Sequence, residues 1–279
     1  MEFYSPLRYP GGKNRLSKFL ASLCKNNDIT GHYIEPYAGG ASVALYLLLN
    51  GFVKEITIND FDRSIYAFWY SVLNDTERFC CKLKNVKVNY NTWKKQKKIH
   101  SKKEHEKNLL KLGFSTLFLN RTNYSGILNG GVIGGLKQKG KYKIDCRFNK
   151  KELIKRIKLI SSYKKYIHVK NMDALVLIKK VKQDKNTIFY FDPPYYLKGP
   201  SLYMNHYKDD DHKKVSFEIQ KITNAKWIVS YDNTNEIKKL YKKCPKKEYN
   251  LLHAAYNNKV GREILFFSNN LVLPRVVSL

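Results

Sequence analysis

The chain has 279 residues, enough to bury a sizeable core as one large domain or as a core with an inserted subdomain, so a mini-protein is excluded. Its 52 lysine and arginine residues exceed its 23 aspartate and glutamate residues, which gives a formal net charge of +29. A lysine-biased genome explains part of this excess, but such a bias would also enrich glutamate. The remaining imbalance indicates a polyanionic partner.

Targeting signals, paired cysteines and metal-ligand spacings are not evident in the sequence. The N-terminal residues lack the charged and apolar regions of a signal peptide, and the apolar run at 41–49 is too short to span a bilayer. Five cysteines without a CxxC pair or zinc spacing are typical of reduced thiols. His100 and His105 flank Glu104, but a five-residue separation does not place them on one helical face. We therefore expect a soluble cytoplasmic protein without membrane contact or a metal site.

Apolar runs that alternate with amphipathic stretches predict an α/β fold. Runs of β-branched and aromatic residues predict strands at 33–34, 53–58, 167–169, 188–191, 227–230 and 264–267, with 251–255 as a further candidate. Amphipathic stretches of helical length lie at 41–49, 62–73, 151–161 and 211–223. This alternation is typical of a mainly parallel sheet with helices on both faces. Because the pattern stops over 75–149, where a lysine-dense segment precedes a glycine-rich one, we interpret that interval as an inserted, mostly helical subdomain.

The N-terminal motif Arg8-Tyr9-Pro10-Gly11-Gly12-Lys13 combines two cations, an aromatic ring and a turn that lets a ligand approach the backbone. It is not a P-loop, because Asn14 follows Lys13 where a P-loop requires serine or threonine. These residues alone are explained equally well by a surface turn with a solvated lysine.

The next motif, over 33–41, places a short strand, a glycine turn and a helix in sequence. The glycines allow a ligand to approach the backbone closely, as in nucleotide-binding turns. About twenty residues later, Asp60 ends the strand at 53–58, a position suited to accepting hydrogen bonds from ribose hydroxyls. The two features predict a nucleoside-type cofactor and leave NAD and S-adenosylmethionine open.

The most specific motif is Asp192-Pro193-Pro194-Tyr195, directly after the strand predicted at 188–191. Two prolines end a strand because they fix φ and remove ladder donors, so the motif lies at a strand's carboxyl end, where ligands bind in open α/β sheets. The carboxylate and a proline carbonyl suit an amine with two N–H donors, and the tyrosine ring suits a flat heterocycle. The motif predicts the exocyclic amino group of a nucleobase as substrate, and a capped proline turn is the alternative.

In their order along the chain, these motifs resemble the Dam-type family of adenine-N6 DNA methyltransferases. Residues 118–126 (Phe-Leu-Asn-Arg-x-x-Tyr-x-Gly) look like the family's recognition-hairpin signature, and the segments 230–233 and 261–265 match as well. The chain departs from the family pattern at Tyr37, where phenylalanine is usual, at Ala41, where glycine is usual, and at Tyr9, where tryptophan is common. These exchanges are chemically mild. The insert matches less closely, which leaves the target sequence open.

The resemblance implies an α/β, Rossmann-like doubly wound methyltransferase core at 1–74 and 150–279, with an inserted DNA target-recognition subdomain at 75–149. By this resemblance, Asp192, Pro193, Pro194 and Tyr195 are catalytic; Tyr9, Lys13, Tyr37, Gly39, Asp60, Asp173 and Asp192 bind S-adenosylmethionine; and Arg8, Asn120, Arg121, Tyr124, Ile127 and Asn129 bind DNA. A helix N-cap explains Asp173 equally well. A hairpin that only packs on the core is the alternative for the DNA-binding set.

The implied reaction is site-specific methylation of the N6 amine of a flipped adenine in duplex DNA, with S-adenosylhomocysteine as product. Asp192 and the Pro193 carbonyl would accept both N–H groups and free the lone pair for a direct in-line displacement, without a metal, a covalent intermediate or a general-base histidine. Stacking on Tyr195 would offset part of the cost of flipping.

Several alternatives stay open at this point. Cytosine N4 is the nearest alternative substrate, and an RNA amine or a protein glutamine amide is a third. A non-catalytic basic nucleic-acid-binding protein is an alternative of a different class. We expect a nucleoid-associated monomer or weak dimer whose partners are double-stranded DNA and, in a restriction–modification pair, a cognate endonuclease.

Overall fold

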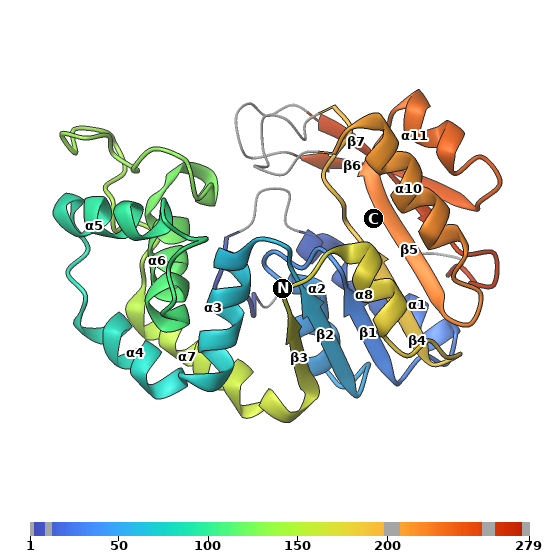
Figure 1. Ribbon diagram of the computed structural model, residues 1–279, viewed down its shortest axis with the longest axis horizontal. Coiled ribbons are helices and arrows are strands. Elements are labelled where there is room, and N and C mark those ends of the chain that lie inside the picture. The colour runs from blue at the N-terminus through green and yellow to red at the C-terminus, as the bar shows by residue number, and fades with distance from the viewer. Residues whose placement is uncertain (1–2, 9–12, 198–206, 253–259, 275–279) are drawn as a thin grey trace.

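The computed structural model describes residues 3–8, 13–197, 207–252 and 260–274. Within these ranges, seven strands form one mixed sheet in the order β3-β2-β1-β4-β5-β7-β6 (Figure 1). Neighbouring strands from β3 to β5 are parallel, whereas β7 is antiparallel to both β5 and β6. The strands are β1 (His32–Glu35), β2 (Glu55–Asn59), β3 (Ile167–Lys170), β4 (Thr187–Phe191), β5 (Lys226–Asp232), β6 (Lys246–Leu252) and β7 (Val260–Phe267).

Alternate residues of the central strands pack into two separate cores. In β4, Ile188 and Tyr190 belong to one core, and Phe189 and Phe191 belong to the other. A period of two is expected for a strand that is buried on both faces. The first core also contains α1 (Ser17–Asn26) and α2 (Ser42–Leu49), and the second contains α8 (Ala174–Lys180), α10 (Asp209–Gln220) and α11 (Asn235–Leu240). Helices therefore cover both faces, and the doubly wound prediction is confirmed.

The strand order reverses at β1, which lies between β2 and β4. The chain continues from β1 to β2 on one side and later enters β4 on the other side. In open α/β sheets, ligands bind in the crevice that such a reversal creates beyond the carboxyl ends of the strands. The segments that follow β1, β2 and β4 therefore meet at one edge of the sheet.

A helical region lies beside β3, at the opposite end of the sheet from β6 (Figure 1). It contains α3 (Arg63–Asn74), α4 (Thr76–Asn85), α5 (Tyr90–His100), α6 (Leu109–Thr122) and α7 (Lys150–Ser162). In this region α6 packs along α3, α5 packs on α6, and α4 packs on α7. Gly113 permits the close approach of α6 to α3, because a Cβ there would lie 2.4 Å from the Ala67 oxygen. Since α3 also contacts β3, this helix joins the helical region to the sheet.

Most element boundaries agree with the sequence prediction, and the differences have local causes. α2 begins at Ser42 because Ala41 adopts a left-handed φ of +47°, and α3 begins after Asp62, whose side chain caps the helix. α10 covers 209–220 rather than 211–223. The helices α1, α8 and α11 were not predicted from the sequence.

The strand predicted at 251–255 was wrong in its position. β6 covers Lys246–Leu252 and pairs with β7 at the edge of the sheet, so its charged residues Lys246 and Glu248 form no apolar run that a pattern could detect. Residues 253–255 lie outside the described ranges. Across the described parts of the chain, the helices are all too short or too polar to cross a membrane.

Candidate functional site

The motif Asp192-Pro193-Pro194-Tyr195 directly follows β4, at the carboxyl edge of the sheet. The side chain of its aspartate is 24% exposed, whereas its tyrosine is 6% exposed. Asp232, the last residue of β5, fixes the following segment, because its carboxylate accepts hydrogen bonds from the N–H groups of Tyr196 and Leu197 at 2.9 Å each. The motif is thus held between the ends of two neighbouring strands.

Lys13 joins this motif from the N-terminal end of the chain. It begins the short helix η1 (Lys13–Leu16), and its side chain is 8% exposed. Its Nζ lies 3.3 Å from Asp192 Oδ1 and 2.7 Å from Glu263 Oε2. The same ammonium donates to Ser230 Oγ at 3.0 Å and to the Tyr195 hydroxyl. Lys13, predicted from the resemblance as a cofactor-binding residue, therefore lies against the Asp192–Tyr195 motif.

Glu263 is a candidate site residue to which the sequence analysis assigns no role. It lies on β7 and is 1% exposed. One carboxylate oxygen accepts a hydrogen bond from the Tyr195 hydroxyl, and the other accepts from Lys13 and from the Tyr249 hydroxyl. A buried charge requires such partners. The sequence signal that could have identified it is a lone carboxylate directly before the apolar run at 264–267.

These residues form a network that we call the Lys13 cluster: Lys13, Asp192, Tyr195, Ser230, Tyr249 and Glu263. Burial raises the pKa of Asp192 to about 6, with Lys13 opposing the rise and Glu263 adding to it. Burial opposes the charge on Lys13, but attraction from Asp192 and the neighbouring phenols raises the Lys13 pKa well above its ordinary value. At neutral pH the cluster therefore contains a charged lysine and an ionised Asp192.

The Asp192 carboxylate retains unused acceptor capacity. Its Oδ1 atom is buried and makes no well-formed hydrogen bond, although it faces the Lys13 ammonium at 3.3 Å. Buried carboxylate oxygens normally accept several hydrogen bonds. The geometry therefore suits a ligand that donates N–H groups at this strand end.

The glycine turn after β1 and the acidic residue after β2 contact each other. Gly39 N donates to Asp60 Oδ2 at 2.9 Å, and its φ of +46° is a conformation that favours glycine. The other oxygen of Asp60 accepts a hydrogen bond from Asp62 N at 2.9 Å. Burial, together with repulsion from the Asp62 carboxylate, raises the pKa of Asp60 to about 7. Two of the predicted cofactor-binding residues are thus adjacent.

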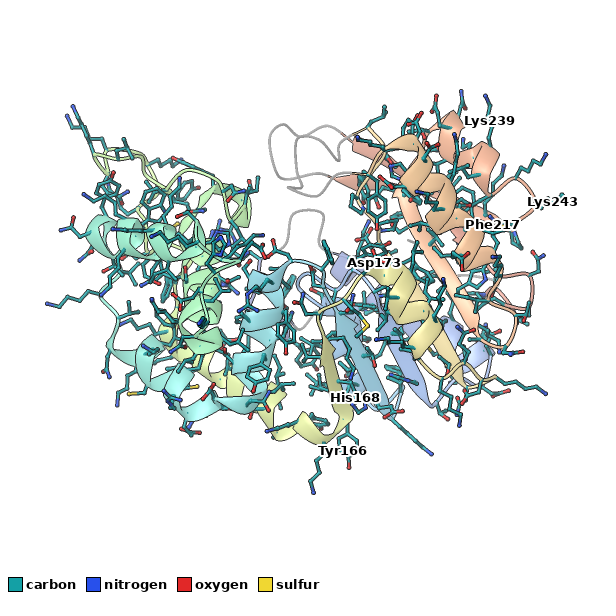
Figure 2. The ribbon with its side chains drawn as sticks, in the orientation of Figure 1. Tyr166, His168, Asp173, Phe217, Lys239 and Lys243 are labelled. Carbon is teal, nitrogen blue, oxygen red and sulfur yellow. The ribbon has the colours of Figure 1, made fainter. Side chains whose placement is uncertain are left out.

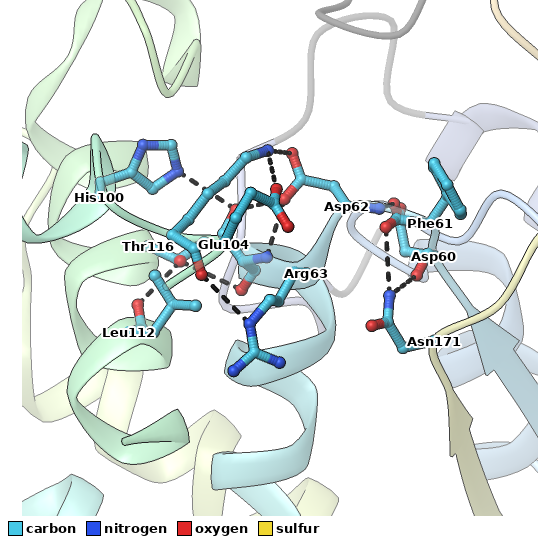
Figure 3. A network of polar contacts seen from close by, with 11 residues as sticks. Asp60, Phe61, Asp62, Arg63, His100, Glu104, Leu112, Thr116 and Asn171 are labelled. Atoms are coloured by element: carbon cyan, nitrogen blue, oxygen red, sulfur yellow. Dashed lines mark hydrogen bonds and ion pairs between the residues drawn. The ribbon is translucent and has the colours of Figure 1, made fainter. Parts of the chain in front are cut away.

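Phe61 is a second residue that the sequence analysis missed. Its side chain is 62% exposed, although it lies between two residues that are tied into hydrogen bonds. The Asn171 amide donates to the carbonyl oxygens of Asp60 and Phe61 at 2.8 and 3.1 Å, which fixes the backbone here (Figure 3). An exposed aromatic ring beside a ribose-type acceptor suits a flat heterocycle. The sequence signal is an aromatic residue directly after an acidic strand end.

The other predicted cofactor-binding residues differ in position. Asp173 lies near the carboxyl edge of the sheet (Figure 2), but its carboxylate caps α8 by accepting from two N–H groups of the first turn at 2.8 and 3.3 Å. This is the N-cap alternative that the sequence leaves open. Tyr37 is half-buried and its hydroxyl pairs with the Tyr207 hydroxyl at 2.9 Å. Tyr9 lies outside the described residues.

The segment that resembles a recognition hairpin forms a compact loop over 124–131, which we call the recognition loop. An isolated antiparallel bridge between Asn123 and Val132 closes it, and the Asn123 amide donates to Ile127 O at 2.8 Å. The backbone of the loop is therefore held from inside. Tyr124, at 51% exposed, and Asn129 point outward, and Ile127 is half-buried.

Two residues predicted to bind DNA make hydrogen bonds within the fold, and one of them, Asn120, is fully buried. Asn120 is 1% exposed: its Oδ1 accepts from Arg8 N at 2.7 Å, and its amide donates to Arg8 O at 2.6 Å and Gly126 O at 2.9 Å. We therefore correct the prediction for Asn120, because a buried and fully hydrogen-bonded amide has no group to offer a base. Arg121 donates through Nε to Pro6 O at 2.7 Å. Both side chains fasten the N-terminal segment to α6, and Asn120 also ties the half-buried Arg8 to the recognition loop through Gly126.

Positive charge is spread widely over the surface. Lys239 and Lys243, for example, are exposed on and just after α11, on the far side of the sheet from the helical insert (Figure 2). The net charge by itself therefore does not locate a DNA-binding face. Among the described residues, no group of three or more histidine, cysteine, aspartate or glutamate side chains is placed to hold a metal ion.

Comparison with known proteins yields one family match over most of the chain. The family model for D12 class N6 adenine-specific DNA methyltransferases matches residues 9–258. The chain is also 26% identical over 209 residues to the Type II methyltransferase M.MjaIII of Methanocaldococcus jannaschii, and that alignment covers 70% of each protein.

Similarity to solved structures is weaker. The protein PH1948 of Pyrococcus horikoshii has a TM-score of 0.43 and 10% identity, with 97% of this chain and 87% of that chain covered. The S-adenosylmethionine-dependent O-methyltransferase TM0748 of Thermotoga maritima has a TM-score of 0.37 and 9% identity, with 91% and 64% covered. Similarity at this level carries no information about substrate or cofactor.

Proposed function

Because the chain belongs to the D12 class N6 adenine-specific DNA methyltransferase family, it is an adenine-N6 DNA methyltransferase, and we propose that Asp192 binds the amine that receives the methyl group. One observation carries this proposal: the buried Asp192 Oδ1 lacks a well-formed hydrogen bond at the carboxyl end of a central strand. The N6 amine of adenine has two N–H donors and requires two acceptors.

The carboxylate of Asp192 and the carbonyl oxygen of Pro193 supply these two acceptors. The adenine amine is a weak nucleophile, because its lone pair is delocalised into the ring. Two hydrogen bonds favour a pyramidal nitrogen and direct the lone pair away from the ring. The enzyme contributes orientation and electrostatic placement to the transfer, both of which act most strongly in the transition state.

Lys13 and Glu263 set the charge of this site. The Lys13 ammonium lies closer to Glu263, at 2.7 Å, than to Asp192, at 3.3 Å. The ammonium keeps Asp192 ionised near neutral pH, while Glu263 draws it away so that Oδ1 stays available to the amine. Glu263 is in this proposal a positioning residue that does not touch the substrate.

Tyr195 stacks on the flipped adenine in our proposal. Its hydroxyl is anchored by Glu263 and Lys13, and the residue is 6% exposed in the absence of DNA. Stacking therefore requires the segment 195–197 to shift when the base enters. A flipped base loses a few kcal/mol of stacking and pairing, of which an aromatic partner restores part.

S-adenosylmethionine is the methyl donor in this proposal, and the donor set at the ends of β1 and β2 fits its nucleoside. The Asp60 carboxylate would hold the ribose hydroxyls, Phe61 would contact the adenine ring, and the turn at Gly39 would allow the close backbone approach. When bound, S-adenosylmethionine supplies an electrophilic methyl group on a sulfonium, a good leaving group.

We assign binding of duplex DNA to the insert at 75–149 and catalysis to the core at 1–74 and 150–279. Tyr124, Ile127 and Asn129 of the recognition loop provide the base contacts, because their side chains project from a backbone that is fixed internally. The M. jannaschii relative is named a Type II methyltransferase, and on that basis we propose that this enzyme acts beside a cognate endonuclease.

Single-molecule sequencing of DNA from a methylation-deficient host that expresses the enzyme tests the proposal. We expect N6-methyladenine in one sequence context for the wild type and a far smaller fraction of modified sites for Asp192→Ala after the same brief induction. Modification at the wild-type level with the Asp192→Ala variant would overturn the role of this residue. Modified adenines without a shared context would overturn the assignment of the recognition loop.

A further inference from the structure

We propose that Lys103, in the lysine-rich insert, is a positioning residue of the cofactor site: through Asp62 it holds the segment that binds the cofactor's nucleoside. The insert and the cofactor then stabilise each other. This inference rests on the proposed cofactor site at Asp60 and Phe61, and it assigns to one lysine of a basic segment a role other than contact with DNA.

Lys103 differs from the lysines around it. Its side chain is 9% exposed, whereas Lys102 and Lys107 are exposed. Its Nζ donates to Asp62 Oδ2 at 2.6 Å and lies 4.0 Å from the exposed Glu104 carboxylate. Buried lysines are rare unless they are paired. A buried ammonium that is committed to a carboxylate is poorly placed to bind a phosphate.

A relay of hydrogen bonds leads from this ion pair to the glycine turn. Asp62 N donates to Asp60 Oδ1, and Gly39 N donates to Asp60 Oδ2, both at 2.9 Å. The other oxygen of Asp62 caps α3 by accepting from Ser64 N at 2.8 Å. The position of Asp62 therefore determines the orientation of the Asp60 carboxylate and of the exposed Phe61 between them.

Four further hydrogen bonds fasten the segment 100–106 of the insert, and α6, to the first turn of α3 (Figure 3). Arg63 donates to Lys103 O at 3.1 Å through Nε and to Glu106 O at 2.8 Å through Nη2. His100 Nε2 pairs with Ser64 Oγ at 3.2 Å. Thr116 Oγ1 donates to Ser64 O at 3.1 Å. The insert is thus attached to the helix turn that directly follows the proposed ribose acceptor, Asp60.

The charges explain why a lysine is needed there. Burial would raise the pKa of Asp62, but the ion pair and hydrogen bonds from Lys103, with those from Ser64, hold it below its ordinary value. Two neighbouring carboxylates, Asp60 and Asp62, repel each other unless a cation compensates. Without the ammonium, Asp62 becomes an unpaired, partly buried charge that turns toward solvent, and the Asp60–Phe61 segment turns with it.

The coupling free energy between two sites is the same in both directions, so each site affects the other equally. If Lys103 orders the cofactor segment, then a bound cofactor product must also order the segment 100–106. The predicted consequence is that S-adenosylhomocysteine slows amide hydrogen exchange at 100–106, a segment that is linked to the proposed cofactor site through Asp62. A residue that only stabilised the fold would not transmit this effect.

The test compares Lys103→Met with Lys102→Met, which removes the same charge from an exposed neighbour. Calorimetry with S-adenosylhomocysteine in the absence of DNA should show at least about tenfold weaker binding for Lys103→Met and an unchanged affinity for Lys102→Met. Lys103→Arg restores the charge and should recover most of the affinity. Hydrogen exchange should show protection of 100–106 by the ligand in the wild type and not in Lys103→Met.

Each outcome bears on the proposal. Equal cofactor affinity for the wild type and Lys103→Met, with equal protection at 100–106, would overturn it. A reduced salt dependence of DNA binding in Lys103→Met alone, with cofactor binding unchanged, would make Lys103 a phosphate contact. If Lys103→Met does not fold, Asp62→Asn and Lys103→Arg decide by the same titration: the proposal requires loss in the first and retention in the second. Failure of the wild type to bind S-adenosylhomocysteine would instead remove the proposed cofactor site itself.

Discussion

The Lys13 cluster and the recognition loop are built in opposite ways. In the cluster the side chains are buried and bonded to one another, with Glu263 and Lys13 at 1% and 8% exposed. In the loop, the backbone is bonded internally and the side chain of Asn129 is exposed, while the Tyr124 ring is 51% exposed and only its hydroxyl is engaged, by Gly134 N at 3.2 Å. Chemistry requires charges that stay in place, whereas recognition requires side chains that a new partner can engage. Substitutions in the two regions should therefore fail in different ways.

The largest effect is expected for Asp192→Ala. It removes an acceptor that acts on the reacting amine, so kcat should fall by about two orders of magnitude or more, equivalent to about 2.7 kcal/mol. DNA affinity should stay within a few-fold of the wild type, because the recognition loop is untouched. Single-turnover methyl transfer and fluorescence anisotropy measure the two quantities. Wild-type turnover in this variant would contradict the assignment of the chemistry to the Lys13 cluster.

Asn120→Ala should destabilise the protein without altering the chemistry of a folded molecule. The substitution leaves the Arg8 backbone N–H and the Arg8 and Gly126 carbonyls without partners, which costs about 2–3 kcal/mol. Urea denaturation measures the loss, and Asn129→Ala is the matched control because that side chain is exposed. Equal stability of the two variants would mean that Asn120 is not a structural residue.

This pair shows where sequence reasoning succeeds and where it stops. The strand before Asp192 and the acidic strand end at Asp60 were predictable, since apolar runs and proline breaks are local signals. Asn120 and Asn129 look alike in sequence, but Asn120 lies on the buried helix α6 and bonds to the backbone of Arg8, 112 residues away. The role of Glu263 depends on contacts with Lys13 and Tyr195, 250 and 68 residues away. No local pattern encodes such contacts.

Glu263→Gln should give an intermediate loss with a distinctive pH profile. In the wild type, activity should be lost as the pH falls through about 6, because Asp192, whose pKa burial raises to about 6, becomes protonated and loses its acceptor. Glu263 contributes to this elevated pKa, so its neutralisation should shift the acidic limb of kcat to lower pH. The freed Lys13 then pairs with Asp192 and competes with the amine, which should lower the plateau by about tenfold.

Tyr249→Phe is the control for that experiment. It removes the hydrogen bond from Tyr249 to Glu263 but keeps the charges of Glu263 and Lys13. The acidic limb of the pH–rate profile should therefore not move. The two pH–rate profiles are measured under saturating DNA and methyl donor. Comparing them distinguishes the effect of the Glu263 charge from the effect of a lost hydrogen bond in the same cluster. An acidic limb that is unmoved in Glu263→Gln would show that Glu263 does not control the charge of Asp192.

The smallest effect is expected in the recognition loop, where Asn129→Ala removes a side chain and disturbs nothing inside the fold. Loss of one base contact costs about 1–3 kcal/mol and relaxes preference at one position, whereas loss of a phosphate contact weakens binding to all sequences alike. We therefore expect kcat/KM for the cognate duplex to fall modestly. The ratio of kcat/KM for the cognate duplex to that for a singly mismatched duplex should fall at one position.

Tyr124→Ala should lower the same ratio, and its affinity for S-adenosylhomocysteine should match the wild type. The measurement is methyl transfer across a library of single-base variants of the site found by sequencing. If the wild type and both variants give superimposable profiles, the exposed side chains of this loop do not read the sequence, and the contrast with the Lys13 cluster would then be one of packing alone.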